Sequence, residues 1–488
     1  MAHKEDYAFM YKVSFVLILA VSSTFSDVYG SNWPQFRGPG GLGVAETNSL
    51  PTNWSDGENI AWKATIPGAG ASSPVIYGNR VFLTCFTGYG VDGTPSGNLD
   101  DLKRHLLCLD AGSGGLLWQK EAETVLPESE TSRFLGYASS TPAADADRVY
   151  CFFGKSGVIA FDHSGNQLWH RSVGDNTHGW GSAASPVLYK DLVIINAFVE
   201  CGQLIALDKT SGREVWRAGD LKESWNTPLL VDLPDGNTEL VIAISGKILG
   251  FDPATGQQLW ECTGHRWYIV PSLIADNGVV YCLSGKGVEA IKAVRAGGRG
   301  DVSDTHVLWT VKKGTNVPSA VYYEGYIYFA HDTKEIAYCL NAATGDVVYE
   351  ERLPRIGGVY ASAVVGAGKI YYVSRGGGTC VLAAKPQYEL LAHNRLEGDR
   401  KANASPAVNG QRLVLRMDRF LYCIGQPTLT GDANVDFRVD FRDYAAIAGS
   451  WLRNDVPACC GADISCDGQI DYGDLNYLVL HWLDRLWF

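Results

Sequence analysis

Residues 206–216 read Ala-Leu-Asp-Lys-Thr-Ser-Gly-Arg-Glu-Val-Trp, and this stretch decides the fold. The residues before it alternate enough to predict a strand at 202–207. The Asp208 carboxylate can accept backbone N–H groups at a turn, and Gly212 can adopt the positive φ that closes the turn. A returning strand starts at Glu214, so the stretch predicts one β-hairpin.

The same pattern recurs along the chain with a period of forty-odd residues. Further copies occupy 108–118, 160–169, 250–260 and 339–349, and a weaker copy ends at Trp309. Self-similarity at this period indicates a stacked or circular repeat architecture.

Each repeat opens with a short motif in which proline marks the first residue of a strand, a position that proline tolerates. The openings are Ser73-Pro74, Thr141-Pro142, Ser185-Pro186, Thr227-Pro228, Val270-Pro271, Val317-Pro318 and Ser405-Pro406, with Ser362-Ala363 in the eighth place. An apolar run, a turn and a second strand follow, and the hairpin then supplies strands three and four. The sequence therefore predicts eight repeats of four strands.

The two ends of the repeat region are each incomplete. The eighth copy, at 405–425, stops after three strands, whereas a strand at 59–66 around Trp62 has no hairpin of its own before it. Joining them would complete the last blade and close a ring without open sheet edges. We therefore predict an all-β, eight-bladed propeller of four-stranded antiparallel blades at 31–426, with the recurring Trp packed between neighbouring blades.

Charge and the N-terminus indicate the compartment. The 488 residues carry a formal net charge of −12 and no Lys/Arg run, which argues against a nucleic-acid partner. Lys12 precedes an apolar run at 13–25 that is too short to span a bilayer but suits a signal peptide, predicted at 1–30. We expect a secreted protein, located in the periplasm, at the cell surface or outside the cell, with no membrane span.

The N-terminal part of the predicted propeller, at 33–43, is rich in Gly and Pro and reads as irregular. Gly38, Gly40 and Gly43 match G-x-G-x-x-G, but no strand precedes the motif and no helix follows it. We therefore do not interpret it as a dinucleotide-binding fingerprint.

Two irregular features are candidates for function. The first repeat carries an insertion at 86–105, and long insertions on a propeller often form a lid or a binding rim. In addition, mostly aromatic residues precede the repeat openings: Tyr137, Trp180, Trp225, Trp267, Tyr268, Asn316, Tyr360 and Asn403. Because the innermost strands enter from one face, we expect these residues to ring a funnel mouth that binds a ligand. The alternative is that they only pack the tops of the blades.

The repeated Ala-x-Asp-x-x-Ser/Thr-Gly-x-x-x-Trp resembles the tryptophan-docking repeat of the PQQ-like propellers, which include quinoprotein alcohol dehydrogenases and the BamB scaffold of outer-membrane barrel assembly. The likeness covers 33–426 and implies the fold, which carries both enzymes and binding scaffolds. Quinoprotein dehydrogenases resembling this fold hold PQQ under a disulfide of adjacent cysteines, beside Ca²⁺ and an Asp base. The adjacent pair Cys459-Cys460 lies beyond the propeller, so we expect no PQQ.

The segment 427–488 reads as a separate domain with two calcium loops. Oxygen-bearing residues occupy places 1, 3, 5, 9 and 12 of each loop, with a backbone carbonyl at place 7, and oxygen ligands suit Ca²⁺. The first loop offers Asp432, Asn434, Asp436, the carbonyl of Arg438, Asp440 and Asp443. The second loop offers Asp463, Ser465, Asp467, the carbonyl of Gln469, Asp471 and Asp474.

Each loop leads into a predicted amphipathic helix, at 444–452 and 475–483. This duplicated loop and helix resembles a type I dockerin, an EF-hand-like module, and the resemblance implies docking through helix surfaces onto a cohesin-type protein. Phe437 stands at place 6 of the first loop, where Gly468 stands in the second. Since place 6 needs the conformational freedom of glycine, we expect the first loop to bind Ca²⁺ more weakly.

The cysteines of the propeller are expected to be free thiols. Cys108, Cys339 and Cys423 stand where sister repeats carry Ala, which predicts small buried side chains. Pairing in the C-terminal segment among Cys459, Cys460 and Cys466 stays open.

These observations favour a secreted, non-catalytic propeller that binds a partner or ligand. A Ca²⁺-dependent, dockerin-like module would attach it to an extracellular or cell-surface assembly. The alternative is an enzyme, either a PQQ-dependent quinoprotein dehydrogenase or a carbohydrate-active component. The sequence names neither the ligand of the propeller nor the receptor of the module.

Overall fold

The computed structural model describes residues 32–91, 97–129, 136–285, 290–354, 357–376, 378–396, 401–426, 439, 441–449, 451, 462–464 and 469–481. The described residues belong to two compact units, Asn32–Thr428 and a unit that contains Leu429–Phe488. Within these ranges no helix is long and apolar enough to cross a membrane. The predicted signal peptide lies outside them.

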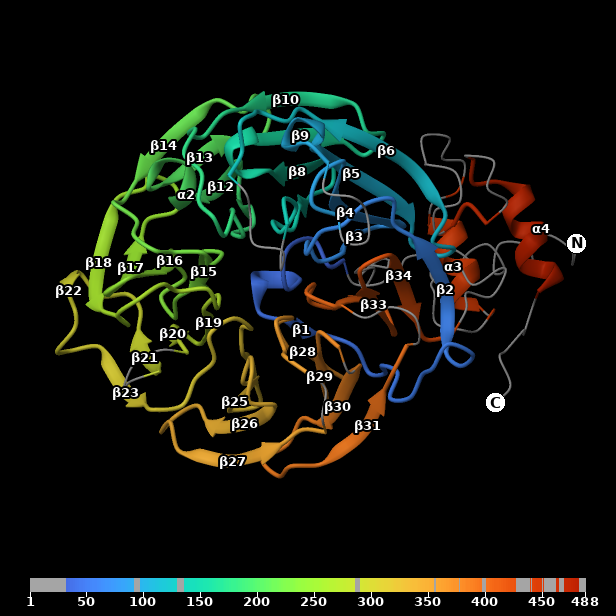
Figure 1. The fold of residues 1–488 in the computed structure, drawn as a ribbon. Helices are drawn as coiled ribbons and strands as arrows, with labels where there is room; N and C mark the ends of the chain where they lie inside the picture. The colour runs from blue at the N-terminus through green and yellow to red at the C-terminus, as the bar shows by residue number, and fades with distance from the viewer. Residues whose placement is uncertain are drawn as a thin grey trace, which may run out of the picture. The chain divides into compact units, whose positions relative to one another are not determined.

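The first unit is a ring of eight antiparallel sheets, each with four strands, as predicted (Figure 1). Blade 1 contains β3 (Val75–Tyr77), β4 (Arg80–Thr87), β5 (Lys103–Asp110) and β6 (Leu116–Ala122), and blade 2 contains β7 (Ala143–Ala144), β8 (Arg148–Phe152), β9 (Val158–Asp162) and β10 (Gln167–Arg171). Blade 3 contains β11 (Val187–Tyr189), β12 (Leu192–Ala197), β13 (Gln203–Asp208) and β14 (Glu214–Ala218), and blade 4 contains β15 (Leu229–Asp232), β16 (Thr238–Ile244), β17 (Lys247–Phe251) and β18 (Gln258–Thr263).

The second half of the ring repeats this arrangement. Blade 5 contains β19 (Ile274–Asp276), β20 (Val279–Leu283), β21 (Ile291–Arg295) and β23 (Val307–Val311), and blade 6 contains β24 (Val321–Tyr323), β25 (Tyr326–Ala330), β26 (Ile336–Asn341) and β27 (Val347–Arg352). Blade 7 contains β28 (Val364–Gly366), β29 (Lys369–Val373), β30 (Thr379–Ala383) and β31 (Leu390–Asn394), and blade 8 contains β32 (Ala407–Asn409), β33 (Arg412–Arg416), β34 (Phe420–Ile424) and β2 (Ile60–Thr65). Two short strands add to sheet edges in parallel, β22 (Gly300–Asp301) beside β18 and β1 (Val44–Ala45) beside β28.

Blade 8 is built from both ends of the repeat region. In its outer pair of strands, β2 runs antiparallel to β34, and Trp62 lies opposite Cys423. The circular closure predicted from the two incomplete copies is therefore confirmed.

The hairpin at 206–216 forms as predicted. The Gly212 N–H donates to the Asp208 carbonyl at 2.8 Å, and the Ser211 N–H donates to the Asp208 carboxylate, also at 2.8 Å. Gly212 has a φ of +66°. These contacts satisfy the polar groups of the turn, so the chain can reverse at this point.

Tryptophans at the ends of the hairpins dock onto the next blade. The Trp169 indole N–H donates to the Lys209 carbonyl at 2.9 Å, and its ring lies against Gly212. Equivalent bonds join Trp62 to Ala111, Trp118 to His163, Trp216 to Pro253 and Trp309 to Ala342. Trp260 differs because its N–H donates to the Glu239 carboxylate within its own blade. The predicted packing of Trp between blades is thus confirmed.

A ring of eight hydrogen bonds links the innermost strands around the channel. In each blade a backbone N–H at the start of the strand donates to the hydroxyl of the equivalent residue in the next blade, at 2.9 to 3.0 Å. The ring runs Ser73, Thr141, Ser185, Thr227, Ser272, Ser319, Ser362, Ser405 and back to Ser73. We call it the hydroxyl ring. In blades 5 and 6 the proline precedes the ring residue, so the predicted openings at Val270 and Val317 are two residues early.

The N-terminal segment, 33–45, crosses the channel on one side of the hydroxyl ring and contains the short 3-10 helix η1 (Pro39–Gly41). Trp33 pairs with Ile76, and the Pro34 carbonyl accepts the Ala144 N–H at 2.7 Å. Both partners lie three residues after a member of the hydroxyl ring in the sequence. The segment then pairs with blade 7 through β1, near the centre of the ring (Figure 1). The segment predicted to be irregular therefore closes one end of the channel.

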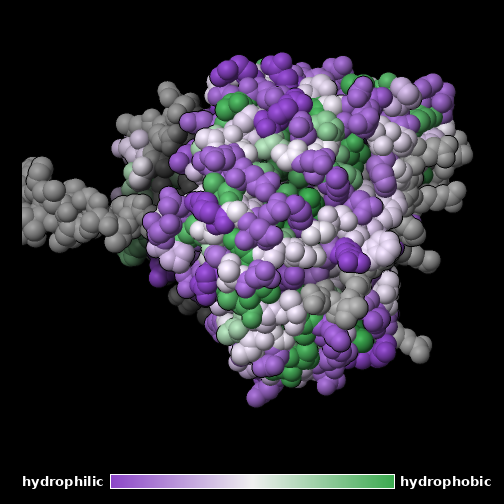
Figure 2. All heavy atoms as spheres, turned by 90° about the vertical axis from the view of Figure 1, so that its left-hand side faces the viewer, coloured by the Kyte–Doolittle hydropathy of each residue, from purple (hydrophilic) through white to green (hydrophobic). Residues whose placement is uncertain are grey.

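The outer wall of the propeller is mostly hydrophilic where it can be seen from the side of β14, β18 and β22 (Figure 2). Exposed apolar residues such as Leu168, Val215 and Leu308 come from different blades. On this side the hydrophobic residues form small, separate groups and no large apolar patch.

The C-terminal unit contains the helices α3 (Phe441–Gly449) and α4 (Tyr472–Leu480). Val439, Ile447, Ala462, Ile470 and Leu478 form its buried cluster. The sequence predicted these helices at 444–452 and 475–483, so each predicted start lies three residues after the observed one. For α4 the reason is that Asp471 acts as the N-cap, its carboxylate accepting the Gly473 N–H at 2.7 Å.

The nine described cysteines are all free thiols. Cys108, Cys339 and Cys423 are completely buried, which confirms the prediction from their exchange with Ala. Cys459, Cys460 and Cys466 lie outside the described residues.

Replacing Gly212 by Ala should destabilise the propeller. An added Cβ would lie 2.6 Å from atoms of the Trp169 ring, and the positive φ would strain any other residue. Strain and overlap together should lower the free energy of unfolding by roughly 2–5 kcal/mol. Gly236→Ala is the matched control, because Gly236 has a φ of +85° and no heavy atom within 4 Å of the added Cβ. Calorimetry should show a clearly larger loss of thermal stability for G212A, and equal losses would contradict the docking role of Trp169.

Candidate functional site

The predicted mouth residues all precede a residue of the hydroxyl ring by two to five positions. The N-terminal segment crosses the channel on the other side of that ring, so the mouth is at the opposite end. The structure brings six of these eight residues together in two groups.

The largest group is an aromatic cluster of Trp180, Trp225 and Tyr268, joined by His178. Ring centroids lie 4.7 Å apart for Trp180 and Tyr268, 5.1 Å for Trp180 and Trp225, and 5.0 Å for His178 and Trp225. The Trp225 indole N–H donates to the Gly181 carbonyl at 2.9 Å, which fixes this ring. Trp180 remains 43% exposed, so the cluster presents an aromatic surface to solvent.

Polar contacts extend the cluster toward blade 6 and form a second group beyond it. The Asn316 amide donates to the Tyr268 hydroxyl at 3.2 Å. In the second group the Arg375 guanidinium lies 4.5 Å from the Tyr360 ring centroid and donates to the Asn403 side chain at 2.8 Å. These bonds hold the mouth residues of blades 5 to 8 in fixed orientations.

The two remaining mouth residues differ in exposure. Trp267 is 59% exposed and has a φ of +79°, a conformation that non-glycine residues rarely adopt. Tyr137 is buried against Phe86 and donates its hydroxyl to the Ser129 carbonyl at 3.0 Å. Tyr137 therefore belongs to the wall beneath the mouth.

The insertion predicted at 86–105 is shorter than expected, because its ends continue the β4–β5 ladder. Phe86 pairs with Arg104 and Thr87 pairs with Lys103, and the intervening residues include the 3-10 helix η2 (Leu99–Asp101). The long strands carry Arg104 into a cleft.

This cleft, which we call the Glu200 cleft, was not predicted. Its lining includes Arg104, Glu128, Tyr137, Ser140, Lys155, His178, Ser182 and Glu200, around about 400 Å³ of open space. Glu200 comes from α2 (Phe198–Cys201), a single helical turn between β12 and β13, and Lys155 comes from the 3-10 helix η3 (Gly154–Ser156). A carboxylate in an apolar stretch between two strands was the available sequence signal.

Glu200 is a buried carboxyl group with only part of its hydrogen-bonding capacity used. Its side chain is 1% exposed, Oε1 accepts the Ser182 hydroxyl, and Oε2 has no partner in the protein. Burial raises the pKa of Glu200 to about 7, because the charged form loses its hydration. At neutral pH this group can therefore exchange a proton with a ligand or with solvent.

Arg104 is neutralised within the wall of the cleft. It forms a buried ion pair with Glu128, and it donates to the Ser156 hydroxyl at 2.7 Å and the Tyr137 carbonyl at 3.2 Å. These three partners hold the guanidinium in place as part of the wall.

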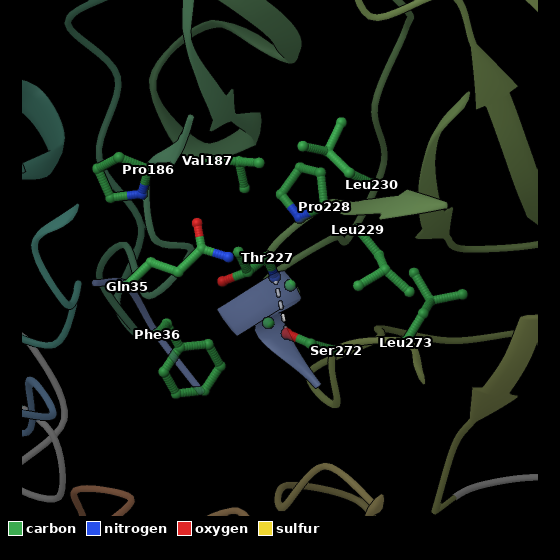
Figure 3. Close-up of a pocket in the computed structure, with 12 residues that line it drawn as sticks. Gln35, Phe36, Pro186, Val187, Thr227, Pro228, Leu229, Leu230, Ser272 and Leu273 are labelled. Carbon is green, nitrogen blue, oxygen red and sulfur yellow. Dashed lines mark hydrogen bonds between the residues drawn. The ribbon is translucent and has the colours of Figure 1, made fainter. Parts of the chain in front are cut away.

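A second cavity lies inside the channel, between the hydroxyl ring and the N-terminal segment (Figure 3). Gln35 and Phe36 face Pro186, Thr227 and Ser272 across it. Its open space is also about 400 Å³, and its lining carries no charged side chain.

Arg37 anchors the N-terminal segment beside this cavity. The guanidinium is completely buried and donates to the carbonyls of Leu42, at 2.8 Å, and Ala320. Burial lowers the pKa of Arg37 to about 9. The bond to Ala320 ties the segment to blade 6, opposite the bonds of Trp33 and Pro34 to blades 1 and 2.

Most of the predicted calcium ligands lie outside the described residues. In the part of the C-terminal unit that is described, Asp443, Asp463 and Asp474 are buried. Among described residues no group of three or more His, Cys, Asp or Glu side chains is arranged to hold a metal ion. The calcium loops therefore stay a prediction.

Comparison with known proteins places this architecture in a family. The family model PQQ_2, described as outer membrane protein assembly factor BamB, matches residues 44–198 and 200–428. The chain belongs to this family. It is also similar to the outer membrane protein assembly factor BamB of Kangiella koreensis, with 26% identity over 201 residues. That match covers 36% of this chain and 49% of the relative, so the chain spans about half the relative's length.

Solved structures share the fold at low identity. A europium-containing methanol dehydrogenase superposes with a TM-score of 0.57 at 12% identity, covering 82% of this chain and 98% of that one. Quinohemoprotein alcohol dehydrogenase from Comamonas testosteroni superposes with a TM-score of 0.55 at 13% identity, covering 82% of this chain and 81% of that one. At this identity the likeness shows the propeller fold alone.

Replacing Glu200 by Gln should change how stability depends on pH. Between its ordinary pKa of 4.5 and the folded value of about 7, the folded protein binds more protons than the unfolded chain, so stability falls as pH rises. At about 1.4 kcal/mol per pH unit, the wild type should lose roughly 3 kcal/mol relative to E200Q between pH 4.5 and pH 8. Urea unfolding at pH 5 and pH 8 measures this difference.

A suitable control is Glu214→Gln, since the exposed Glu214 pairs with Arg217, which lowers its pKa. E214Q should not reproduce the change. A stability difference between wild type and E200Q that is the same at both pH values would contradict the raised pKa.

Proposed function

We propose that this protein is an extracytoplasmic, non-catalytic propeller that binds a ligand or partner at the open mouth of its channel. The observation that carries the proposal is the aromatic cluster, where hydrogen-bonded rings leave Trp180 exposed. Loops fixed by a rigid scaffold and rich in exposed aromatic residues are typical of binding surfaces. The N-terminal segment crosses the opposite end of the channel.

The family supports an extracytoplasmic binding role. Its model and the Kangiella koreensis relative are both described as an outer membrane protein assembly factor. The apolar run at 13–25, interpreted as part of a signal peptide, fits the same location. We therefore propose protein partners in the periplasm, at the cell surface or outside the cell.

The competing proposal is a PQQ-dependent dehydrogenase, since structural relatives include a quinohemoprotein alcohol dehydrogenase. PQQ carries three carboxylates and requires compensating cations or hydrogen-bond donors. The cavity inside the channel has Gln35, Thr227 and Ser272 as its polar side chains and no charged one. This lining favours the proposal that the propeller works without PQQ.

Addition of PQQ with Ca²⁺ should produce no dye-linked oxidation of alcohols. The assay uses the full chain, a panel of primary alcohols and an artificial electron acceptor, with a quinoprotein dehydrogenase as the positive control. Turnover that depends on PQQ would overturn the non-catalytic proposal.

For the C-terminal unit we propose a dockerin-like module with two Ca²⁺ sites that attaches the propeller to a cohesin-type protein. The proposal rests on the two runs of oxygen-bearing residues at matching places of a Ca²⁺ loop, of which Asp443, Asp463 and Asp474 are buried in the described part of the unit. Phe441 and Tyr472 are 76% and 77% exposed at the start of α3 and α4. Such exposed rings on two related helices support a docking role.

Calorimetric titration of the full chain with Ca²⁺ should reveal two sites of unequal affinity. Asp463→Ala should remove the tighter site, because place 1 of a loop supplies a carboxylate ligand, whereas Asp432→Ala should leave it intact. Phe437→Gly should tighten the weaker site. Capture on an immobilised cohesin should require Ca²⁺ and fail in chelator. Loss of the tighter site in the Asp432 variant, or no Ca²⁺ binding at all, would contradict the proposal.

A further inference from the structure

We infer that the Glu200 cleft is a binding site for one neutral sugar residue, a ligand class that deepens the binding function proposed above and rests on it. The cleft lies below the mouth, where side chains from blades 1 to 3 meet. Three properties carry the inference: its unpartnered polar atoms, its charge balance and its aromatic rim.

Two buried side chains in the lining have polar atoms without a partner in the protein. They are Glu200, 1% exposed, through Oε2, and Ser140, 4% exposed, through its hydroxyl. Buried polar groups are nearly always hydrogen-bonded, so these two point to a polar ligand. A ligand with several hydroxyls can donate to the carboxylate and accept from the serine.

The charges of the lining favour a neutral ligand. Arg104 is paired with Glu128, and the ammonium of Lys155 donates to the Pro127 carbonyl at 2.7 Å. With Glu200 ionised, two cations and two carboxylates face the cleft, and His178 and Tyr137 are the remaining titratable side chains of the lining. An organic cation or an anion would gain little net attraction here, whereas a polyhydroxylated molecule would find both donors and acceptors.

The aromatic rim agrees with a single sugar ring. His178 lines the cleft and meets the exposed Trp180 ring at 5.6 Å between centroids. An aromatic surface beside polar groups suits a pyranose, because one face of that ring presents C–H groups and its edge presents hydroxyls.

The test is calorimetric titration of the full chain with glucose, galactose, mannose, N-acetylglucosamine and cellobiose, followed in parallel by tryptophan fluorescence. We expect at least one of these sugars to bind and to change the fluorescence of Trp180. Glu200→Gln should weaken that binding about tenfold or more, because hydrogen bonds to a charged group are stronger than those to a neutral one. Glu214→Gln, on the outer strand β14, should bind as the wild type does.

A second variant keeps the test informative if E200Q fails to fold. Trp180 is exposed, so Trp180→Ala should fold, lose the fluorescence response and bind the sugar more weakly. Co-sedimentation with insoluble cellulose and mannan distinguishes a free sugar from a sugar residue of a polysaccharide. Binding to the polymers as well as to free sugars shows that the site recognises a residue within a polysaccharide. Binding of free sugars alone shows recognition of a single residue, and both results support the inference.

The inference is overturned if none of the sugars or polymers binds, if spermidine or inorganic phosphate binds instead, or if both variants bind a sugar as well as the wild type. These outcomes differ from failure of the proposed function. PQQ-dependent oxidation would overturn the non-catalytic role and leave sugar binding in place. Loss of sugar binding with retained Ca²⁺-dependent capture on cohesin would overturn only the sugar site.

Discussion

The hydroxyl ring is the constraint on which the rest of the propeller depends. Except in blade 7, where β1 pairs with β28, the innermost strand of a blade has no neighbouring strand on its channel side, so the polar groups at its start need other partners. A Ser or Thr at this position solves the problem because it donates its N–H to one neighbour and its hydroxyl accepts from the other. The last bond, from Ser405 to Ser73, joins residues more than three hundred positions apart and closes the cycle. Since every member has both roles, the ring closes without an unpaired member.

The hydroxyl ring also gives the channel its two different ends. Beyond the ring, backbone groups of the innermost strands are free to pair with another segment, and residues 33–45 pair with them in blades 1, 2 and 7. Before the ring, the loops between blades are long enough to carry aromatic side chains, and rings such as Trp225 are tied to neighbouring loops. The asymmetry between a closed end and an aromatic mouth thus follows from which side of the ring the chain enters each blade.

The fold was predictable because its rules are local and repeated. Asp208 and Gly212 encode a turn that recurs in most repeats, and counting the repeats then gives the blades and their closure at Trp62. The hydroxyl ring was only partly predictable, because the repeat openings were aligned on proline. In blades 5 and 6 the proline lies two positions earlier relative to the ring residue than in the other blades that have one. The N-terminal segment was missed because its bonds reach partners up to some three hundred residues away, which no local pattern records. The start of α4 was predicted too late because Asp471 was assigned to a metal loop, whereas it also caps this helix.

The Glu200 cleft shows why a site can escape a sequence that reveals the fold so fully. Repeats identify what blades share, whereas the cleft depends on departures from the repeat in three successive blades. The long strands β4 and β5 of blade 1 place Arg104 in the cleft. The connection after blade 1 supplies Glu128, and an added helical turn in blade 3 supplies Glu200. Each departure alone resembles a tolerated surface insertion. Because all three converge, and because a buried carboxyl group with an unused oxygen costs stability, the cleft is better explained by binding than by packing.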